Sequence, residues 1–169
     1  MEQASPSLGI FINYRREDTG PYARLMQVRL GQCFPDAPVF MDLDSIEAGV
    51  DFAEAIESAV RSCVVLIVLI GRQWLAIADD EGRRRLDNPD DYVRFEIHAA
   101  LERGVRVIPV LVDGTRAPQQ QQLPDALHRL ARLNALEMSY GRFAEDEARL
   151  MTVIRKVLES QVSLVRRVG

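Results

Sequence analysis

The sequence predicts an α/β fold of the flavodoxin-like type, a three-layer sandwich with a five-stranded parallel sheet of order 2-1-3-4-5 and helices on both faces. Short apolar runs alternate with segments of helical periodicity, which is typical of parallel strands joined by helical crossovers. Residues 63–70 are almost entirely apolar, so this strand is expected at the sheet centre, covered on both faces. Right-handed crossovers leave few arrangements of five strands, and 2-1-3-4-5 is a common one.

The individual elements follow from local composition and spacing. Strands are expected where apolar, β-branched and aromatic residues cluster, at residues 8–14, 39–41, 63–70, 105–112 and 135–138. Helical spacing of apolar residues predicts helices at 19–30, 52–60, 89–103 and 144–158, with weaker helical character at 123–133 and a short helix around Trp74. The charged residues 15–18 are expected as a loop. Pro109 lacks an N–H donor, so an irregular or unpaired position is expected within its strand.

The chain as a whole is expected to form one domain of a soluble cytoplasmic protein. Its 169 residues suffice for a single core, here residues 8–159, with a flexible leader at 1–7 and a tail or linker start at 160–169. The net charge is −4 and basic residues are scattered, which argues against nucleic acid as a partner. No signal peptide or membrane-spanning segment is apparent. Cys33 and Cys63 lack metal-ligand spacing and are expected as buried, reduced thiols.

An acidic residue within the third predicted helix has no local explanation. Asn88 suits the N-cap and Pro89 the first helical position, and Gly104 is a natural C-cap. Glu96 lies at the edge of the apolar stripe, and no basic residue stands three or four positions away. It is either a solvated glutamate on the helix flank or a carboxylate at the rim of a cleft. The second interpretation gains support because ligands bind where the strand order reverses, on the side toward which this helix lies.

Missing motifs exclude several common chemistries. The sequence lacks GxGxxG after the first predicted strand, GxxxxGK[ST] and GxSxG, which argues against a dinucleotide-cofactor site, a P-loop nucleotidase and an α/β-hydrolase. His98 and His128 lie far apart in the sequence, and no metal site is expected. A phosphoacceptor receiver domain would share the fold but needs an acidic cluster after the first strand. Here Arg15 and Arg16 occupy that place.

Four segments together resemble the successive conserved boxes of a TIR (Toll/interleukin-1 receptor) domain. They are IFINYRRED at 10–18, VFMDLDSIEAGVDF at 39–52, CVVLIVLIGRQWL at 63–75 and YVRFEIHAAL at 92–101. The resemblance is strongest to bacterial, NAD-consuming members. It implies an NAD+ glycohydrolase that yields nicotinamide and ADP-ribose or a cyclic product, is activated by self-assembly and acts in antiphage defence. NAD+ is then substrate rather than cofactor, and the expected partners are further copies of the domain. The alternative is a non-catalytic TIR–TIR scaffold.

The resemblance also assigns site residues. Glu96 matches the essential glutamate of a [W/Y]-x-x-x-E-I pattern, with Tyr92 at its aromatic position. The other residues expected near the substrate are Tyr14, Arg15, Arg16, Asp42 and Trp74. The loop expected to gate the pocket and dock onto a neighbouring copy comprises Ser45, Ile46, Glu47, Ala48 and Gly49.

Several of these residues have an alternative, purely structural interpretation. The two arginines bind phosphate oxygens, or one of them pairs with Glu17, Asp18 or Asp42. Tyr14 is better explained as strand core than as a substrate contact. Trp74 is either a packing anchor or a stacking platform, and Tyr92 either packs on the substrate or belongs to the core.

Overall fold

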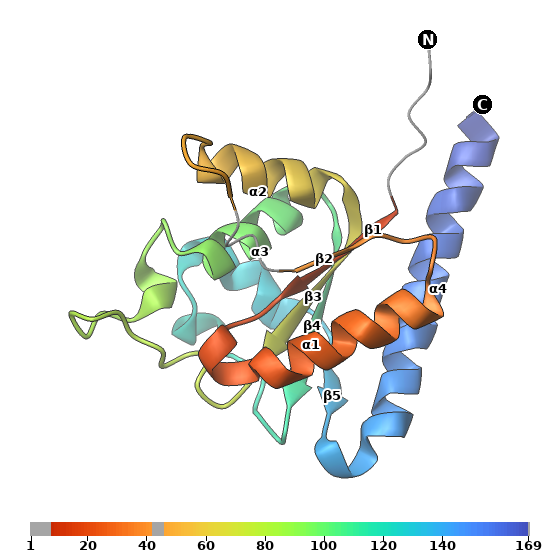
Figure 1. Cartoon of the computed structure of the whole chain (residues 1–169). Helices are drawn as coiled ribbons and strands as arrows, with labels where there is room; N and C mark the ends of the chain where they lie inside the picture. The colour runs from red at the N-terminus through yellow and green to blue at the C-terminus, as the bar shows by residue number, and fades with distance from the viewer. Residues whose placement is uncertain (1–7, 42–45, 169) are drawn as a thin grey trace.

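The computed structural model describes residues 8–41 and 46–168 and contains a five-stranded parallel sheet (Figure 1). The strands are β1 (Gly9–Asn13), β2 (Val39–Phe40), β3 (Cys63–Ile70), β4 (Arg106–Val112) and β5 (Leu136–Met138). Their order is β2-β1-β3-β4-β5, which confirms the predicted fold class and topology. The predictions made for residues 1–7, Asp42 and Ser45 lie outside the described residues.

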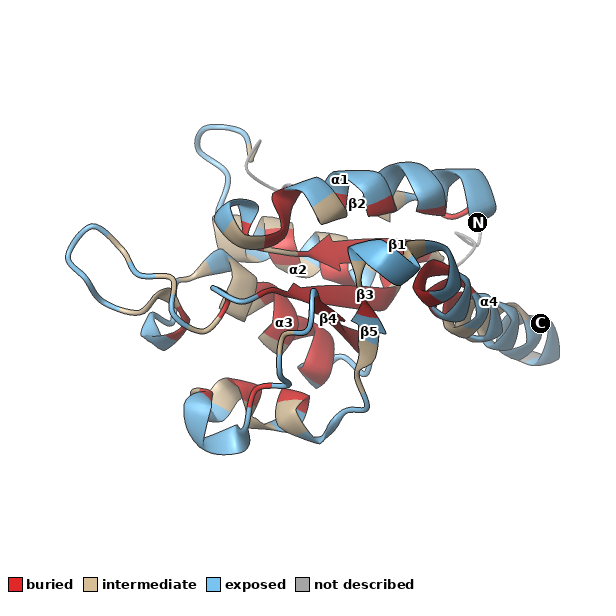
Figure 2. Ribbon diagram, turned by 90° about the horizontal axis from the view of Figure 1, so that it is seen from below, coloured by how far each residue is buried: buried red, intermediate tan, exposed pale blue. Residues whose placement is uncertain are grey.

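Helices cover both faces of the sheet, as Figure 2 shows. One face packs against α1 (Arg16–Cys33) and α4 (Phe143–Val168). The other packs against α2 (Phe52–Arg61), α3 (Tyr92–Glu102) and the 3-10 helix η4 (Asp125–Arg132). Shorter 3-10 turns are η2 (Arg85–Asp87), η3 (Gln120–Gln122) and η5 (Tyr140–Arg142). In the described part of the chain, no helix has both the length and the apolar character that crossing a bilayer requires.

The sheet separates two hydrophobic cores, because successive side chains of a strand point to opposite faces. From β1, Ile10 and Ile12 join the core under α1 and α4, whereas Phe11 joins the core under α2 and α3. Seven of the eight residues of β3 are buried, which confirms its predicted central position. The strand therefore holds both cores together.

Helix α1 starts earlier than predicted, because residues 16–18 form its first turn rather than a loop. The two parts of α1 meet at Thr19, whose backbone angles (φ −128°, ψ 21°) are not helical, and Pro21 follows shortly after. Proline lacks an N–H donor and is best tolerated at the start of a helix, which explains the break. Thus the charged residues after β1 are held in a helical turn at the end of that strand.

Two other local predictions concern the segment around Trp74 and Pro109. The segment around Trp74 forms turns instead of a short helix, because Asp18 accepts hydrogen bonds from the backbone N–H groups of Gly71 (2.8 Å) and Gln73 (3.0 Å). Pro109 stays in register with β3, but β5 begins to pair with β4 only at Val110, so the proline lies at a position that is unpaired on the β5 side, one of the two outcomes expected from the sequence.

The C-terminal segment and the cysteines can also be compared with expectation. Helix α4 continues through the segment expected as a tail, to Val168. Cys63 is buried as predicted, but Cys33 is exposed because it lies in the last turn of α1, on its solvent side.

Candidate functional site

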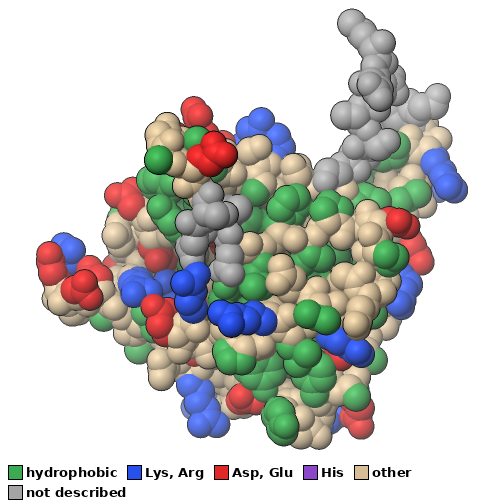
Figure 3. All heavy atoms as spheres, in the orientation of Figure 1, with side chains coloured by type: hydrophobic (Ala, Val, Ile, Leu, Met, Phe, Trp, Pro, Cys, Tyr) green, Lys and Arg blue, Asp and Glu red, His purple; other side chains and the backbone are tan. Residues whose placement is uncertain are grey.

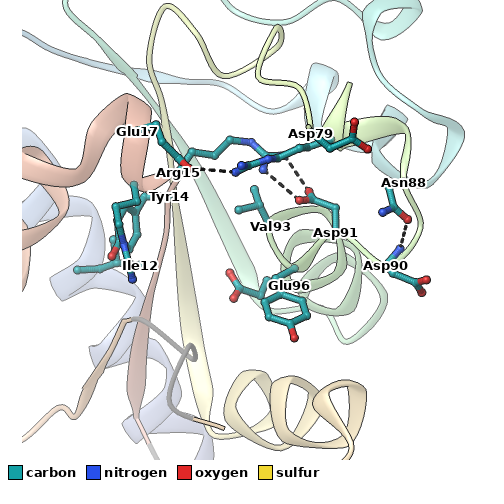
Figure 4. Close-up of a pocket in the computed structure, with 13 residues that line it drawn as sticks. Ile12, Tyr14, Arg15, Glu17, Asp79, Asn88, Asp90, Asp91, Val93 and Glu96 are labelled. Carbon is teal, nitrogen blue, oxygen red and sulfur yellow. Dashed lines mark hydrogen bonds and ion pairs between the residues drawn. The ribbon is translucent and has the colours of Figure 1, made fainter. Parts of the chain in front are cut away.

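A cavity opens at the carboxyl end of β1, between that strand and the first turns of α3 (Figure 4). Its volume is about 440 Å³, within the usual range of small-molecule sites. The neighbours β1 and β3 lie where the strand order reverses, the position at which open α/β sheets bind ligands. The lining residues come from the end of β1, the start of α1, the segment before α3 and α3 itself: Ile12, Tyr14, Arg15, Arg16, Glu17, Asp79, Arg85, Asn88, Asp90, Asp91, Tyr92, Val93 and Glu96.

Helix α3 begins three residues later than the sequence indicated. Its N-cap is Asp91, whose carboxylate accepts a hydrogen bond from the backbone N–H of Arg94 at 3.0 Å. Asn88 instead accepts from the backbone N–H of Asp90 at 3.0 Å and closes a turn that contains Pro89. The later start places Glu96 in the second turn of the helix.

Glu96 is a buried carboxylate beside the end of β1. It is 8% exposed, and in Figure 4 its carboxylate points from α3 toward that strand. The side-chain amide of Asn13, the last residue of β1, donates a hydrogen bond to Glu96 Oε2 at 2.7 Å. The solvated-flank interpretation is therefore wrong, and the geometry agrees with a carboxylate at a cleft. Asn13 was not predicted from the sequence. Its position as a polar residue at the end of an apolar strand could have indicated a functional role.

Arg15 forms a buried ion pair at the mouth of the cavity. Its guanidinium donates to both carboxylate oxygens of Asp91, at 3.0 and 2.8 Å, and the two side chains are only 2% and 10% exposed. The partner is therefore none of the three acids expected from the sequence. Since the helix-capping carboxylate already neutralises its charge, Arg15 holds α3 in place rather than offering a free cation to a phosphate.

A second basic group, which sequence reasoning missed, faces the cavity from η2. Arg85 Nη1 donates a hydrogen bond to Glu17 Oε1 at 3.3 Å and forms an ion pair with it, and both side chains are partly exposed. A hydrogen bond from its own backbone amide, followed by the attraction of Arg85, lowers the pKa of Glu17 although partial burial opposes the shift. Arg16 and Tyr14, two of the residues expected near the substrate, line the same cavity. Arg16, at the start of α1, and Arg85, in η2, thus both contribute to the cavity wall.

The segment that carries Arg85 is a small hairpin beside the cavity. An antiparallel bridge joins Ala78 to Arg84, and Gly82 makes the turn with φ +77°. Asp79 accepts hydrogen bonds from the backbone N–H groups of Glu81 and Arg83. Figure 3 shows the charged tip of this hairpin projecting from the body, with acidic and basic side chains together. The charged segment between Trp74 and α3 is therefore held by its own hydrogen bonds, and Asp79 and Arg85 of this segment supply part of the cavity wall.

The two aromatic candidates have different positions. Tyr92 is 41% exposed and lines the cavity, and its ring packs on Phe52 with a centroid distance of 5.1 Å. Trp74 is fully buried in the core under α2 and α3 and does not line the cavity. The prediction of Trp74 as a substrate contact is therefore wrong, because its large apolar ring fills the core instead.

The loop before α2 forms a second hollow next to the first. Residues 46–52 and Tyr92 surround about 400 Å³, and Gly49 bends the loop with φ +87°. Of the predicted loop, Ile46, Glu47, Ala48 and Gly49 therefore lie beside the candidate site, with Tyr92 lining both hollows.

Fold and site together define a doubly wound α/β domain with a buried carboxylate in a cavity at its topological switch point. Comparison with known families identifies the class more closely, because the family model described as TIR domain matches residues 10–153. The chain therefore belongs to the TIR domain family, as the sequence motifs indicated.

A curated relative and two solved structures extend this comparison. The chain is 26% identical over 137 residues to the NAD(+) hydrolase sarm1 of Drosophila melanogaster, a match that covers 80% of this chain but only 9% of that protein. The TIR domains of the activated Roq1 resistosome, which directly recognises the pathogen effector XopQ, give a TM-score of 0.61 at 16% identity, over 89% of this chain and 98% of that one. A metazoan TIR-STING receptor from C. gigas in complex with 2′,3′-cGAMP gives a TM-score of 0.53 at 17% identity. This match covers 88% of this chain and 38% of that one. At these identities, the two structures show the fold alone.

Proposed function

We propose that this TIR domain is an NAD+ glycohydrolase with Glu96 as its catalytic carboxylate. The observation that carries the proposal is the burial of Glu96 beside a cavity at the switch point of the sheet. The similarity to an NAD(+) hydrolase, which covers 80% of this chain, supports the same reaction.

One carboxylate is sufficient for this chemistry. The bond between the ribose anomeric carbon and the pyridinium nitrogen breaks, and its electron pair stays with nitrogen, so nicotinamide leaves neutral and needs no proton. The ribose becomes an oxocarbenium-like cation, as in glycoside hydrolysis. Water then attacks the anomeric carbon and releases a proton, which gives ADP-ribose. A fixed carboxylate such as Glu96 stabilises the positive charge that develops on the sugar and accepts hydrogen bonds from its hydroxyls.

The surrounding residues have complementary roles in this proposal. The half-exposed ring of Tyr92 packs on the nicotinamide or the ribose at the cavity mouth. Arg16 and Arg85 bind the diphosphate oxygens from the cavity wall through charge-assisted hydrogen bonds. Arg15 keeps α3, and with it Glu96, at a fixed distance from β1.

The proposal includes activation by self-assembly and a role in bacterial antiphage defence. The loop at residues 46–49 lies beside Tyr92, so a neighbouring copy that contacts this loop also contacts one wall of the site. Docking there couples assembly to the geometry of the cavity. Turnover is therefore expected to rise more steeply than in proportion to protein concentration.

The test is release of nicotinamide from NAD+ by concentrated protein, measured by chromatography over a series of protein concentrations and with a crowding agent. Wild type and Glu102→Ala are expected to release nicotinamide, and Glu96→Ala is not. Glu102 is the matched control because it lies in the same helix with a side chain 63% exposed. Turnover that survives Glu96→Ala removes Glu96 from its role. Absence of turnover from wild type at every concentration identifies a non-catalytic TIR–TIR scaffold instead.

A further inference from the structure

Strand β1 ends in a fully buried amide that contacts α3 in two places. The side-chain nitrogen of Asn13 donates to Glu96 Oε2 at 2.7 Å and to the backbone carbonyl of Val93 at 3.1 Å. The first acceptor is the candidate catalytic carboxylate, and the second belongs to the first turn of the helix that carries it. A single NH2 group therefore links the carboxylate to the end of the central sheet.

These contacts determine the orientation of the Asn13 amide. A backbone carbonyl only accepts hydrogen bonds, and so does an ionised carboxylate, so the NH2 end must face them. The opposite end, Asn13 Oδ1, is buried, and no described residue provides it with a hydrogen-bond partner. An unpaired buried oxygen lowers stability, and an apolar side chain of the same shape avoids that loss. The donor toward Glu96 is thus the distinctive contribution of an asparagine at this position.

A neighbouring residue reinforces the contact. Residues two apart along an extended strand point to the same face, and the backbone of Arg15 is still extended at φ −103° and ψ 124°. Arg15 accordingly reaches the same helix two residues after Asn13, through its bidentate pair with Asp91. The end of β1 thereby holds α3 at its cap, its first turn and its second turn.

We propose that Asn13 is a positioning residue that fixes the Glu96 carboxylate for the sugar cation. This inference rests on the proposed NAD+ glycohydrolase function. A preorganised carboxylate stabilises charge without reorganising during the reaction, whereas one that rotates between rotamers loses part of this effect. Oxygen Oε2 can accept more than one hydrogen bond, so its contact with Asn13 is compatible with substrate hydroxyls.

The first test is spectroscopic and needs no activity. In a 15N-labelled full chain, the side-chain NH2 signals of Asn13 are assigned by their loss in Asn13→Leu. Glu96→Ala is expected to shift the proton that faces the carboxylate upfield, whereas Glu102→Ala leaves it unchanged. An Asn13 signal that does not respond to Glu96→Ala overturns the proposal.

The second test separates positioning from substrate binding. Asn13→Leu keeps the approximate shape and removes the donor, so kcat for NAD+ is expected to fall on the order of 10- to 100-fold while KM changes less than about twofold. Asn13→Asp, which is isosteric but replaces the donor by an acceptor, is expected to lower kcat further, and it also serves if Asn13→Leu fails to fold. Asn134→Leu is the control, since Asn134 is exposed at the opposite end of the sheet.

The outcomes distinguish this inference from the proposed function. Wild-type turnover with unchanged kcat in both Asn13 variants overturns the positioning role and leaves the NAD+ glycohydrolase intact. Absence of turnover in wild type overturns the enzymatic function. In that case, the NMR response alone decides whether Asn13 holds the Glu96 carboxylate.

Discussion

Replacing Arg15 by methionine tests whether this arginine supports α3 or binds substrate phosphate. Methionine keeps much of the side-chain volume and removes the charge. If Arg15 were chiefly a phosphate ligand, its loss would weaken NAD+ binding and leave the fold unaffected. Because it forms a buried bidentate pair with Asp91, we expect the main effect on the free energy of unfolding.

The size of this effect follows from burial. Removal of one partner from a buried ion pair costs about 3–5 kcal/mol, since the other charge remains buried without its partner. The Asp91 side chain is 10% exposed and keeps its hydrogen bond from Arg94 N. We therefore expect Arg15→Met to lower the free energy of unfolding by about 3 kcal/mol, the lower end of this range. In the double variant Arg15→Met/Asp91→Asn the isolated charge is gone and asparagine still caps the helix. The expected loss then falls to about 1 kcal/mol.

Urea unfolding measures both values. The fluorescence of Trp74 reports the transition, because it is the single tryptophan of the chain and is fully buried. Arg24→Met, an exposed position in α1, is the control and is expected to stay close to wild type. A loss below about 1 kcal/mol for Arg15→Met, or a double variant no more stable than the single one, would refute the supporting role.

Two further predictions concern the scaffold around the site. Gly71→Ala is expected to lower the free energy of unfolding by roughly 2 kcal/mol, because a Cβ there would lie 2.6 Å from Asp18 Oδ2. Gly31→Ala, which meets nothing within 4 Å inside α1, is expected to raise it by up to about 1 kcal/mol, and equal urea midpoints for the two variants would contradict this account. Burial raises the pKa of the Cys63 thiol to about 12, so at pH 9 iodoacetamide is expected to modify exposed Cys33 and leave Cys63 protonated and unmodified. Mass spectrometry of the native protein checks this prediction, and equal labelling of the two cysteines would contradict it.

The strands could be predicted from sequence because burial determines their composition. The apolar run at residues 63–70 coincides with β3, since a strand covered on both faces leaves no polar alternation. Crossover handedness then limits the topology, and the observed order agrees. Glu96 could be singled out as well, because a glutamate at the edge of an apolar stripe lacked any local basic partner.

The details of the site could not be predicted, because they depend on contacts between distant residues. Asn88 and Asp91 are both good N-cap residues, and the structure uses Asp91. Its carboxylate accepts a hydrogen bond from Arg94 N and also pairs with Arg15, which is distant in the sequence. Asn13 lies 83 positions from Glu96 in the sequence, so no local pattern reveals their hydrogen bond. Likewise, only the packing of the core shows that Trp74 is an anchor.

The rate of nicotinamide release by Glu96→Gln at saturating NAD+ tests the central claim most directly. Glutamine keeps the size of the side chain and removes the negative charge that faces the developing sugar cation. We predict a decrease of at least about 100-fold relative to wild type, with Glu102→Gln at the wild-type rate. A Glu96→Gln rate within about tenfold of wild type would contradict the assignment of Glu96 as the catalytic carboxylate.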